Sequence, residues 1–203
     1  MRYAEVGPKR AGAPLVLFCH GWPESWYSWR HQLLAVSAAG FRCVAPDMRG
    51  YGGTEAPEPI DQYTLLHLVG DMAELVKALG ETKAVIVGHD WGAPVAWHAA
   101  LWRPDLFPAV CAMSVPYAPP GYIDVISALE KLGINDFYLQ YFQKPSVAEA
   151  ELQGDIRGAL RRLYYTAGGD MTETGKGFAR LAAGTLLSNT VDPEQLPAWL
   201  GEA

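Results

Sequence analysis

Apolar residues in the first half of the chain form two kinds of run, some continuous and some with helical spacing. The continuous runs predict buried strands, because a strand covered on both faces is apolar throughout. The helical runs stop at glycine or proline, where helices commonly end. The predicted strands are Leu15–His20, Arg42–Pro46, Ala84–Gly88 and Ala109–Val115, and the predicted helices are Tyr27–Ala39, Tyr63–Leu79 and Ala93–Trp102.

The alternation of strands and helices predicts an α/β fold with a mainly parallel sheet flanked by helices. Parallel neighbours need a crossover connection, and crossover helices cover the two faces of the sheet. Before the first of these strands, MRYAEVG (residues 1–7) resembles the tail of an opening strand.

The pattern changes after Val115. Residues 116–121 (PYAPPG) are rich in proline and glycine and read as a hinge, and helical patterns without a further strand follow as far as Ala203. The sequence therefore predicts a core part over residues 1–115 and a helical part over residues 116–203. Three arginines of the helical part are expected to form a solvated helix face: Arg157, Arg161 and Arg162.

Composition and charge exclude several classes of protein. The 203 residues are 50% hydrophobic and 19% charged, which suits a globular domain with a sizeable core. A net charge of −6 and a pI near 5.3 argue against nucleic acid or an anionic membrane as a partner. No uncharged apolar run is long enough to span a membrane. We also expect no cofactor or metal, because neither a phosphate-binding glycine loop nor a Cys/His cluster with ligand spacing occurs.

The cysteines and the N-terminus bear on the compartment. Cys19, Cys43 and Cys111 make an odd count in apolar settings, so we expect buried free thiols in a reducing compartment. The N-terminal residues lack the apolar stretch of a signal peptide. Together these features predict a cytoplasmic protein.

The segment Gly88–Gly92 (GHDWG) carries the clearest chemical signal. It has the form Gly-x-nucleophile-x-Gly between a predicted strand and a predicted helix, which is the context of a nucleophile elbow. The turn is so tight that a Cβ on either side would clash, and the central side chain is exposed at the carboxyl edge of the sheet. The alternative is that Asp90 only caps the following helix.

Asp90 at the centre of the elbow selects the reaction. A carboxylate is charged at pH 7 and needs no base for a first attack, and it forms an ester with an electrophilic carbon. This chemistry suits strained epoxides or carbon–halogen bonds better than amides, and it disfavours a serine-type esterase.

A second signal is His20–Pro23 (HGWP), directly after the first continuous strand. A loop there can aim a backbone N–H at the same point as the N–H of Trp91, and two such donors would stabilise an oxyanion during ester hydrolysis. Taken alone, this tetrapeptide is also compatible with a simple tight turn.

Together, the segments HGWPESWYSWRHQ (residues 20–32), DMRGYGGT (47–54), GHDWGA (88–93) and FYLQYFQKP (137–145) resemble the α/β-hydrolase-fold epoxide hydrolases. The resemblance implies an inserted helical cap over residues 116–203 and a detoxifying hydrolase that converts an epoxide to a vicinal diol. It implies Asp90 as nucleophile and the backbone N–H groups of Trp22 and Trp91 as the oxyanion hole. It also implies that a cap tyrosine, Tyr138, protonates the epoxide oxygen.

The indoles of Trp22 and Trp91 are expected to line the substrate pocket. Asp47 and Arg49 of the second segment are expected to hold a loop at the sheet edge; the alternative is that they form a wall of the active site.

The chain departs from this family in its histidines. The family activates the hydrolytic water with a histidine near the C-terminus, oriented by a carboxylate. Of the histidines here only His98 follows the nucleophile, and its place two turns into the elbow helix predicts a packed side chain. A second cap tyrosine is also expected beyond Ala203. The sequence thus resembles the first two-thirds of a hydrolase, with an incomplete sheet that exposes an apolar edge.

Three interpretations remain open. The first is an epoxide hydrolase that forms the ester on Asp90 but receives its histidine and acid from a second polypeptide. The second is a haloalkane dehalogenase, although Trp22 stands where that family usually has a halide-binding asparagine. The third is a catalytically incomplete fragment that acts as an assembly partner. A homo-oligomer is compatible with each.

Overall fold

The computed structural model covers the whole chain and describes residues 1–9, 12–119, 124–171, 177 and 179–201. By their internal contacts the residues form two compact units, Met1–Pro119 and Pro120–Ala203. The boundary inferred from the sequence lies slightly earlier, after residue 115. Pro120 and Gly121, the last two residues of the predicted hinge, lie outside the described residues.

The first unit is built around a mixed five-stranded sheet in the order β1-β3-β2-β4-β5. Strands β2 to β5 are parallel to their neighbours, and β1 pairs antiparallel with β3. The strands are β1 Tyr3–Val6, β2 Leu15–Cys19, β3 Arg42–Pro46, β4 Ala84–His89 and β5 Ala109–Met113. The predicted α/β fold is confirmed, and residues 3–6 form a paired edge strand.

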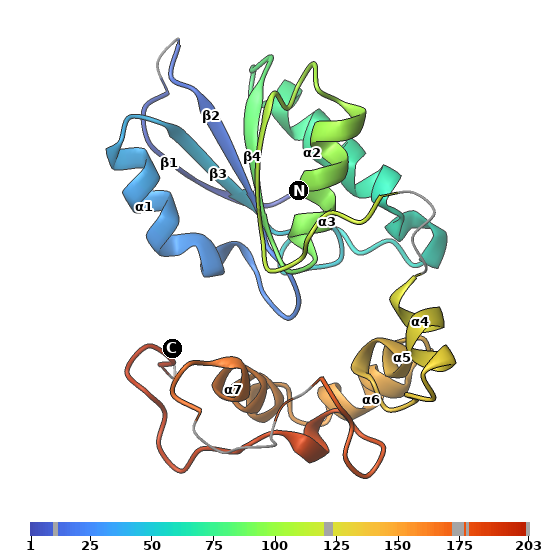
Figure 1. Cartoon of the computed structure of the whole chain (residues 1–203). Coiled ribbons are helices and arrows are strands. Elements are labelled where there is room, and N and C mark those ends of the chain that lie inside the picture. The colour runs from blue at the N-terminus through green and yellow to red at the C-terminus, as the bar shows by residue number, and fades with distance from the viewer. Residues whose placement is uncertain (10–11, 120–123, 172–176, 178, 202–203) are drawn as a thin grey trace. The chain divides into compact units, whose positions relative to one another are not determined.

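Helices cover both faces of this sheet, with α1 on one face and α2 and α3 on the other (Figure 1). Alternate residues of β2 supply the two cores: Leu15 and Leu17 pack toward α2 and α3, and Val16 and Phe18 pack in the other cluster with Leu33 of α1. The helices are the 3-10 helix η1 Trp26–Trp29, α1 Arg30–Ala38, the 3-10 helix η2 Ile60–Tyr63, α2 Leu65–Ala78 and α3 Gly92–Trp102.

Two predicted helices begin later than expected because their predicted first residues, Tyr27 and Tyr63, lie in the 3-10 helices η1 and η2. The hydroxyl of Ser25 accepts the Tyr27 N–H, and the first turn after it is a 3-10 helix, so α1 begins only at Arg30. Thr64 is extended and its side chain accepts the His67 N–H, which separates α2 from the 3-10 helix before it.

Strand β5 differs from the buried strands because its residues alternate between exposed and half-buried. It lies at the end of the strand order, with β4 as its only neighbour among the described strands. Cys111 of β5 is exposed, so the prediction of three buried thiols holds for Cys19 and Cys43 and is wrong for Cys111. The physical reason is its position at the sheet edge, which the apolar neighbours in sequence do not reveal.

In the residues described, the second unit is helical as far as Ala167. Its described residues after Ala167 are mostly turns and irregular segments, with one short 3-10 helix and an isolated β-bridge between Ala182 and Thr185, so the prediction of helical structure as far as Ala203 is wrong for this stretch. The helices of the unit are α4 Val125–Lys131, α5 Tyr138–Phe142, α6 Val147–Gln153, α7 Ile156–Ala167 and the 3-10 helix η3 Leu187–Asn189. None of the helices in the described part of the chain has the length and apolar character needed to cross a membrane.

Two arginines of α7 correct the expectation of a solvated helix face. Arg162 donates to the carbonyl of Leu187 at 2.6 Å and to the hydroxyl of Thr190 at 3.0 Å, and Arg161 donates to the carbonyl of Pro193. Both are half-buried, whereas Arg157 is exposed as expected. The polar partners come from a segment far along the chain, so helical periodicity does not identify them.

Candidate active site

Asp90 lies at the turn between β4 and α3. Its backbone has a φ of 50°, a left-handed conformation that non-glycine residues rarely adopt. The Asp90 carbonyl accepts the Ala93 N–H at 2.9 Å, so the helix starts immediately after the turn. A strained residue between a strand and a helix is the geometry of a nucleophile elbow.

The glycines on either side of Asp90 allow this turn. A Cβ on Gly88 would lie 2.1 Å from the carbonyl oxygen of Gly92 in the same turn. A Cβ on Gly92 would lie 2.1 Å from the carbonyl oxygen of Cys19, at the end of the neighbouring strand β2. The elbow therefore packs against both the helix and β2 at distances that no side chain permits.

The loop after β2 brings a donor to Asp90. Cys19 pairs with Gly88 across the parallel β2–β4 ladder, so the loops after both strands emerge at the same edge. The backbone N–H of Trp22 donates to Oδ1 of Asp90 at 2.9 Å. Gly21 lies directly beside the nucleophile, because a Cβ there would be 2.4 Å from Oδ1 of Asp90. The Trp22–Pro23 peptide bond is cis.

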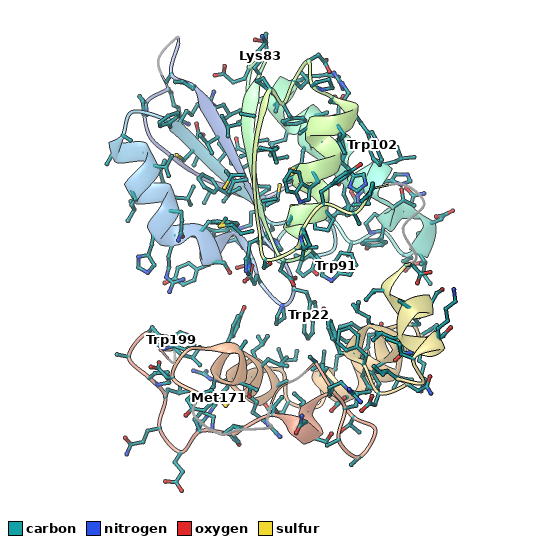
Figure 2. The ribbon with its side chains drawn as sticks, in the orientation of Figure 1. Trp22, Lys83, Trp91, Trp102, Met171 and Trp199 are labelled. Atoms are coloured by element: carbon teal, nitrogen blue, oxygen red, sulfur yellow. The ribbon has the colours of Figure 1, made fainter. Side chains whose placement is uncertain are left out.

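The side chains of both predicted oxyanion-hole residues lie at this edge. Figure 2 shows Trp22 and Trp91 at the same end of the first unit, opposite to Lys83, which precedes β4. Trp91 is the N-cap of α3, and 49% of its surface is exposed. A large exposed indole beside the elbow offers apolar area for a small organic ligand.

Two residues that contact the elbow, Glu24 and Ser114, were not predicted from the sequence. Glu24 accepts the Gly21 N–H through Oε2 at 3.0 Å, and its Oε1 lies 3.4 Å from Nδ1 of His89. Glu24 thus ties the loop to the residue preceding Asp90. The hydroxyl of Ser114 accepts the Asp90 N–H at 3.0 Å. A carboxylate three residues after Gly21 is the one hint of the first contact; nothing local indicates the second.

His20 is a buried, neutral side chain next to the loop that contacts Asp90. Its Nε2 accepts the Met48 N–H at 2.9 Å, so the ring proton lies on Nδ1 and is donated to the Gly21 carbonyl at 2.8 Å. Burial lowers the pKa of His20, and this outweighs the nearby carboxylates of Glu24 and Asp47.

Tyr51 packs edge-on against the His20 ring, with ring centroids 4.8 Å apart. Burial raises the pKa of Tyr51 to about 12, and the negative charges of Asp90 and Glu24 act in the same direction. Tyr51 is therefore a neutral phenol near the carboxylates of Asp90 and Glu24.

The loop of residues 47–54 is held as the sequence predicted. The buried carboxylate of Asp47 accepts the N–H groups of Trp26 and Gly53 at 3.2 and 3.0 Å. Arg49 donates to both carboxylate oxygens of Asp71 at 2.8 and 2.6 Å. Asp47 and Arg49 thus stabilise the loop and its attachment to α2.

His98 is bound within its own helix. Its Nδ1 lies 2.7 Å from the carbonyl oxygen of Pro94, and its ring packs against Trp102 with centroids 4.7 Å apart. It also lies roughly 9 Å along the helix axis from the first residue of α3, from the rise of 1.5 Å per residue. The prediction of a packed histidine agrees with these contacts.

Tyr138 is the first residue of α5 in the second unit. Its N–H donates to the Ala179 carbonyl at 3.0 Å, and its half-buried ring contacts Phe137 and Phe142 at centroid distances of 4.8 and 5.7 Å. The hydroxyl of Tyr141, one turn on, is buried and donates to Glu151 at 2.6 Å. Burial, and next the bond to Glu151, raise the pKa of Tyr141 to about 12.

The described part of the chain contains no group of three or more His, Cys, Asp or Glu side chains arranged to hold a metal ion. What the site offers is a carboxylate on a strained turn, a backbone N–H already bound to it, and the exposed indole of Trp91. These are the parts needed for covalent attack on an electrophilic carbon.

Comparisons with known proteins point in the same direction. The chain is 40% identical over 205 residues to Epoxide hydrolase A of Mycobacterium tuberculosis (strain ATCC 25618 / H37Rv), covering 100% of this chain and 63% of that protein. It is 45% identical to Epoxide hydrolase 3 of Siraitia grosvenorii, covering 100% and 61%. The solved epoxide hydrolase from an endophytic Streptomyces has a TM-score of 0.88 and 46% identity, covering 98% of this chain and 60% of that one.

The chain thus spans about three fifths of the length of these relatives. The sequence pattern of the alpha/beta hydrolase fold matches residues 14–149, which include β2 to β5, the elbow and α5. With the strand order, the elbow geometry and these likenesses agreeing, the chain belongs to the α/β-hydrolase fold family.

Proposed function

We propose that Asp90 is the nucleophile of an epoxide hydrolase. The Asp90 carboxylate attacks an epoxide carbon, the carbon–oxygen bond of the ring breaks, and its electron pair stays on the oxygen, which takes up a proton. The product of this step is a hydroxyalkyl ester on Asp90. Water then cleaves the ester and releases the vicinal diol.

The hydrogen bond from the Trp22 N–H to Oδ1 of Asp90 is the observation that carries this proposal. It holds one carboxylate oxygen, so Oδ2 is the oxygen that attacks and Oδ1 becomes the ester carbonyl. The same N–H then stabilises the negative charge on Oδ1 when water adds to the ester. Trp91, at the N-terminus of α3, is the second proposed donor, because N–H groups at a helix start lack partners within the helix.

Tyr138 is the proposed proton donor. An alkoxide is a poor leaving group, and a phenol with an ordinary pKa near 10 is protonated at neutral pH. The contacts of Tyr141 support the choice between the two tyrosines of FYLQYFQ, because its hydroxyl already donates to Glu151 and its raised pKa makes it a weaker acid.

The base for the second step is proposed to come from residues outside this chain. His20 and His98 are bound to backbone groups of the core, and His89 pairs with Glu24. A histidine that activates water must reach the ester through a hydrogen bond or one water. We therefore expect this chain to form the ester without hydrolysing it.

Intact mass spectrometry of the chain with styrene oxide tests the proposal. The expected result is one stable adduct mapped to Asp90, absent from Asp90→Asn. Diol formation without an adduct would contradict the expectation that the base lies elsewhere. If neither an adduct nor a diol forms, the epoxide hydrolase proposal is contradicted, and the interpretation as a non-catalytic assembly partner remains. Chloride release from a chloroalkane without an epoxide adduct would favour a dehalogenase.

A further inference from the structure

Ser114 follows β5 directly and has a φ of 65°, a left-handed conformation that is uncommon outside glycine. The Val115 N–H donates to the Met113 carbonyl at 2.9 Å, which closes a three-residue turn around Ser114. A turn of this kind is most easily made by glycine, because glycine has no Cβ to clash.

The side chain of Ser114 meets a second left-handed residue. The paired ladder of β4 and β5 ends at His89 and Met113, so Asp90 and Ser114 are the next residue on each strand. There the Asp90 N–H donates to the Ser114 hydroxyl at 3.0 Å. The hydroxyl thus extends the ladder by one bond, at the point where both backbones leave the sheet with positive φ.

Helix α3 anchors the Ser114 turn from the other side. The indole N–H of Trp97 donates to the Val115 carbonyl at 3.1 Å. Trp97 lies on α3, which begins just after Asp90. The turn at Ser114 is therefore hydrogen-bonded both to the elbow, through Asp90, and to α3, through Trp97. These two hydrogen bonds fix the position of the Ser114 hydroxyl relative to the Asp90 backbone.

We propose that Ser114 is a positioning residue for the nucleophile, a role that rests on the function proposed above. Its hydroxyl holds the Asp90 backbone in the left-handed conformation that keeps Oδ1 on the Trp22 N–H. Without this acceptor the Asp90 N–H bonds to water, and the elbow spends less time in the geometry for attack. The hydroxyl, and not the turn shape, is the reason for serine at this position.

Substitutions at Ser114 separate the hydroxyl from the turn. Ser114→Gly removes the hydroxyl and relieves the left-handed strain, so we expect an unfolding midpoint at or above that of the parent and alkylation by styrene oxide about fivefold slower. Ser114→Ala loses the hydroxyl and keeps the strain, and we expect the same slowing. Ser114→Thr keeps the hydroxyl, so alkylation stays near the parent rate although a β-branched residue lowers the midpoint.

Ser146 is a matched control. It is a left-handed serine with a φ of 64°, it lies in the second unit, and its side chain makes no capping bond to α6. Ser146→Gly relieves the same kind of strain, so it is expected to leave alkylation unchanged.

Amide hydrogen exchange at Asp90 gives a readout independent of chemistry. We expect exchange about fivefold faster in Ser114→Gly and Ser114→Ala, and parent-like exchange in Ser114→Thr. If Ser114→Gly is alkylated and exchanges its Asp90 amide at the same rates as the parent chain, the proposal is overturned. If the parent chain is not alkylated, the epoxide hydrolase function fails, and the exchange rates alone decide whether Ser114 holds the elbow.

Discussion

The N–H of Trp22 and Oδ1 of Asp90 are joined by a hydrogen bond of 2.9 Å between residues 68 positions apart in the chain. The bond exists because β2 and β4 are parallel neighbours whose following loops meet at one edge. It joins a proposed oxyanion donor to the proposed nucleophile before any substrate is present. Such a preformed contact lowers the reorganisation needed during the reaction.

Gly21→Ala tests how close the loop must lie to the nucleophile. The new Cβ would lie 2.4 Å from Oδ1 of Asp90, so either the carboxylate or the Trp22 N–H must move. We expect alkylation by styrene oxide to slow about 100-fold, measured by intact mass over time. Gly70→Ala, in α2 with open space around its Cβ, is the control and should alkylate normally. Equal rates in the two variants would show that the loop adapts.

Tyr138→Phe tests the proposed proton donor. Loss of the phenol should slow adduct formation about 100-fold or more, the lower range of general acid catalysis. Tyr141→Phe removes the neighbouring hydroxyl, which is bound to Glu151, and should slow alkylation little while lowering stability. If adduct formation is slow in Tyr141→Phe and close to the parent rate in Tyr138→Phe, Tyr141 is the proton donor instead.

Glu151 stabilises the second unit by joining three segments. It accepts the hydroxyl of Tyr141 and the N–H groups of Leu186 and Leu187 at 2.6, 2.9 and 2.9 Å. Glu151→Ala leaves these donors without their acceptor, so we expect a loss of about 3 kcal/mol in the free energy of unfolding. Urea unfolding followed by circular dichroism measures it. Glu149→Ala, two residues earlier on α6 and exposed, should change stability little; a similar loss there would contradict the role of Glu151.

His20 makes stability depend on pH. Burial lowers its pKa from the usual 6.5, so the unfolded chain takes up a proton near pH 6.5 and the folded chain only at lower pH. The stability from neutral His20 is therefore present above pH 6.5 and is lost as the pH falls below it, with a limiting slope of about 1.4 kcal/mol per pH unit. Urea unfolding between about pH 5 and 7.5 should show this slope in the parent and not in His20→Gln. If the free energy of unfolding depends on pH in the same way in the parent and in His20→Gln, His20 is not the source of the pH dependence.

Local signals predicted the elbow and the sheet that carries it. Gly88 and Gly92 flank Asp90 because no side chain fits there, and this requirement is visible in five consecutive residues. The strand Arg42–Pro46 was predicted with the bounds that the structure has, since its apolar run is short and continuous. The start of α2 was missed by two residues, although Thr64 as N-cap is also a local signal.

The contacts of Glu24 with His89, of Ser114 with Asp90 and of Arg162 with Leu187 could not be predicted from the sequence. Each contact joins groups that lie far apart in the sequence, and neither periodicity nor a motif identifies such partners. The exposure of Cys111 has the same cause, because it depends on the place of β5 in the sheet.

The sequence by itself determined the α/β fold and the tight turn at Asp90, and it indicated the kind of chemistry proposed for a carboxylate there. These follow from residue spacing and from the volume of side chains, which are local properties. Only the tertiary structure decided that Trp22 holds Oδ1, that Ser114 accepts the Asp90 N–H, and that Glu24 lies beside His89. A hydrogen bond requires two groups within about 3 Å, and between distant residues only the packing of the sheet provides that proximity.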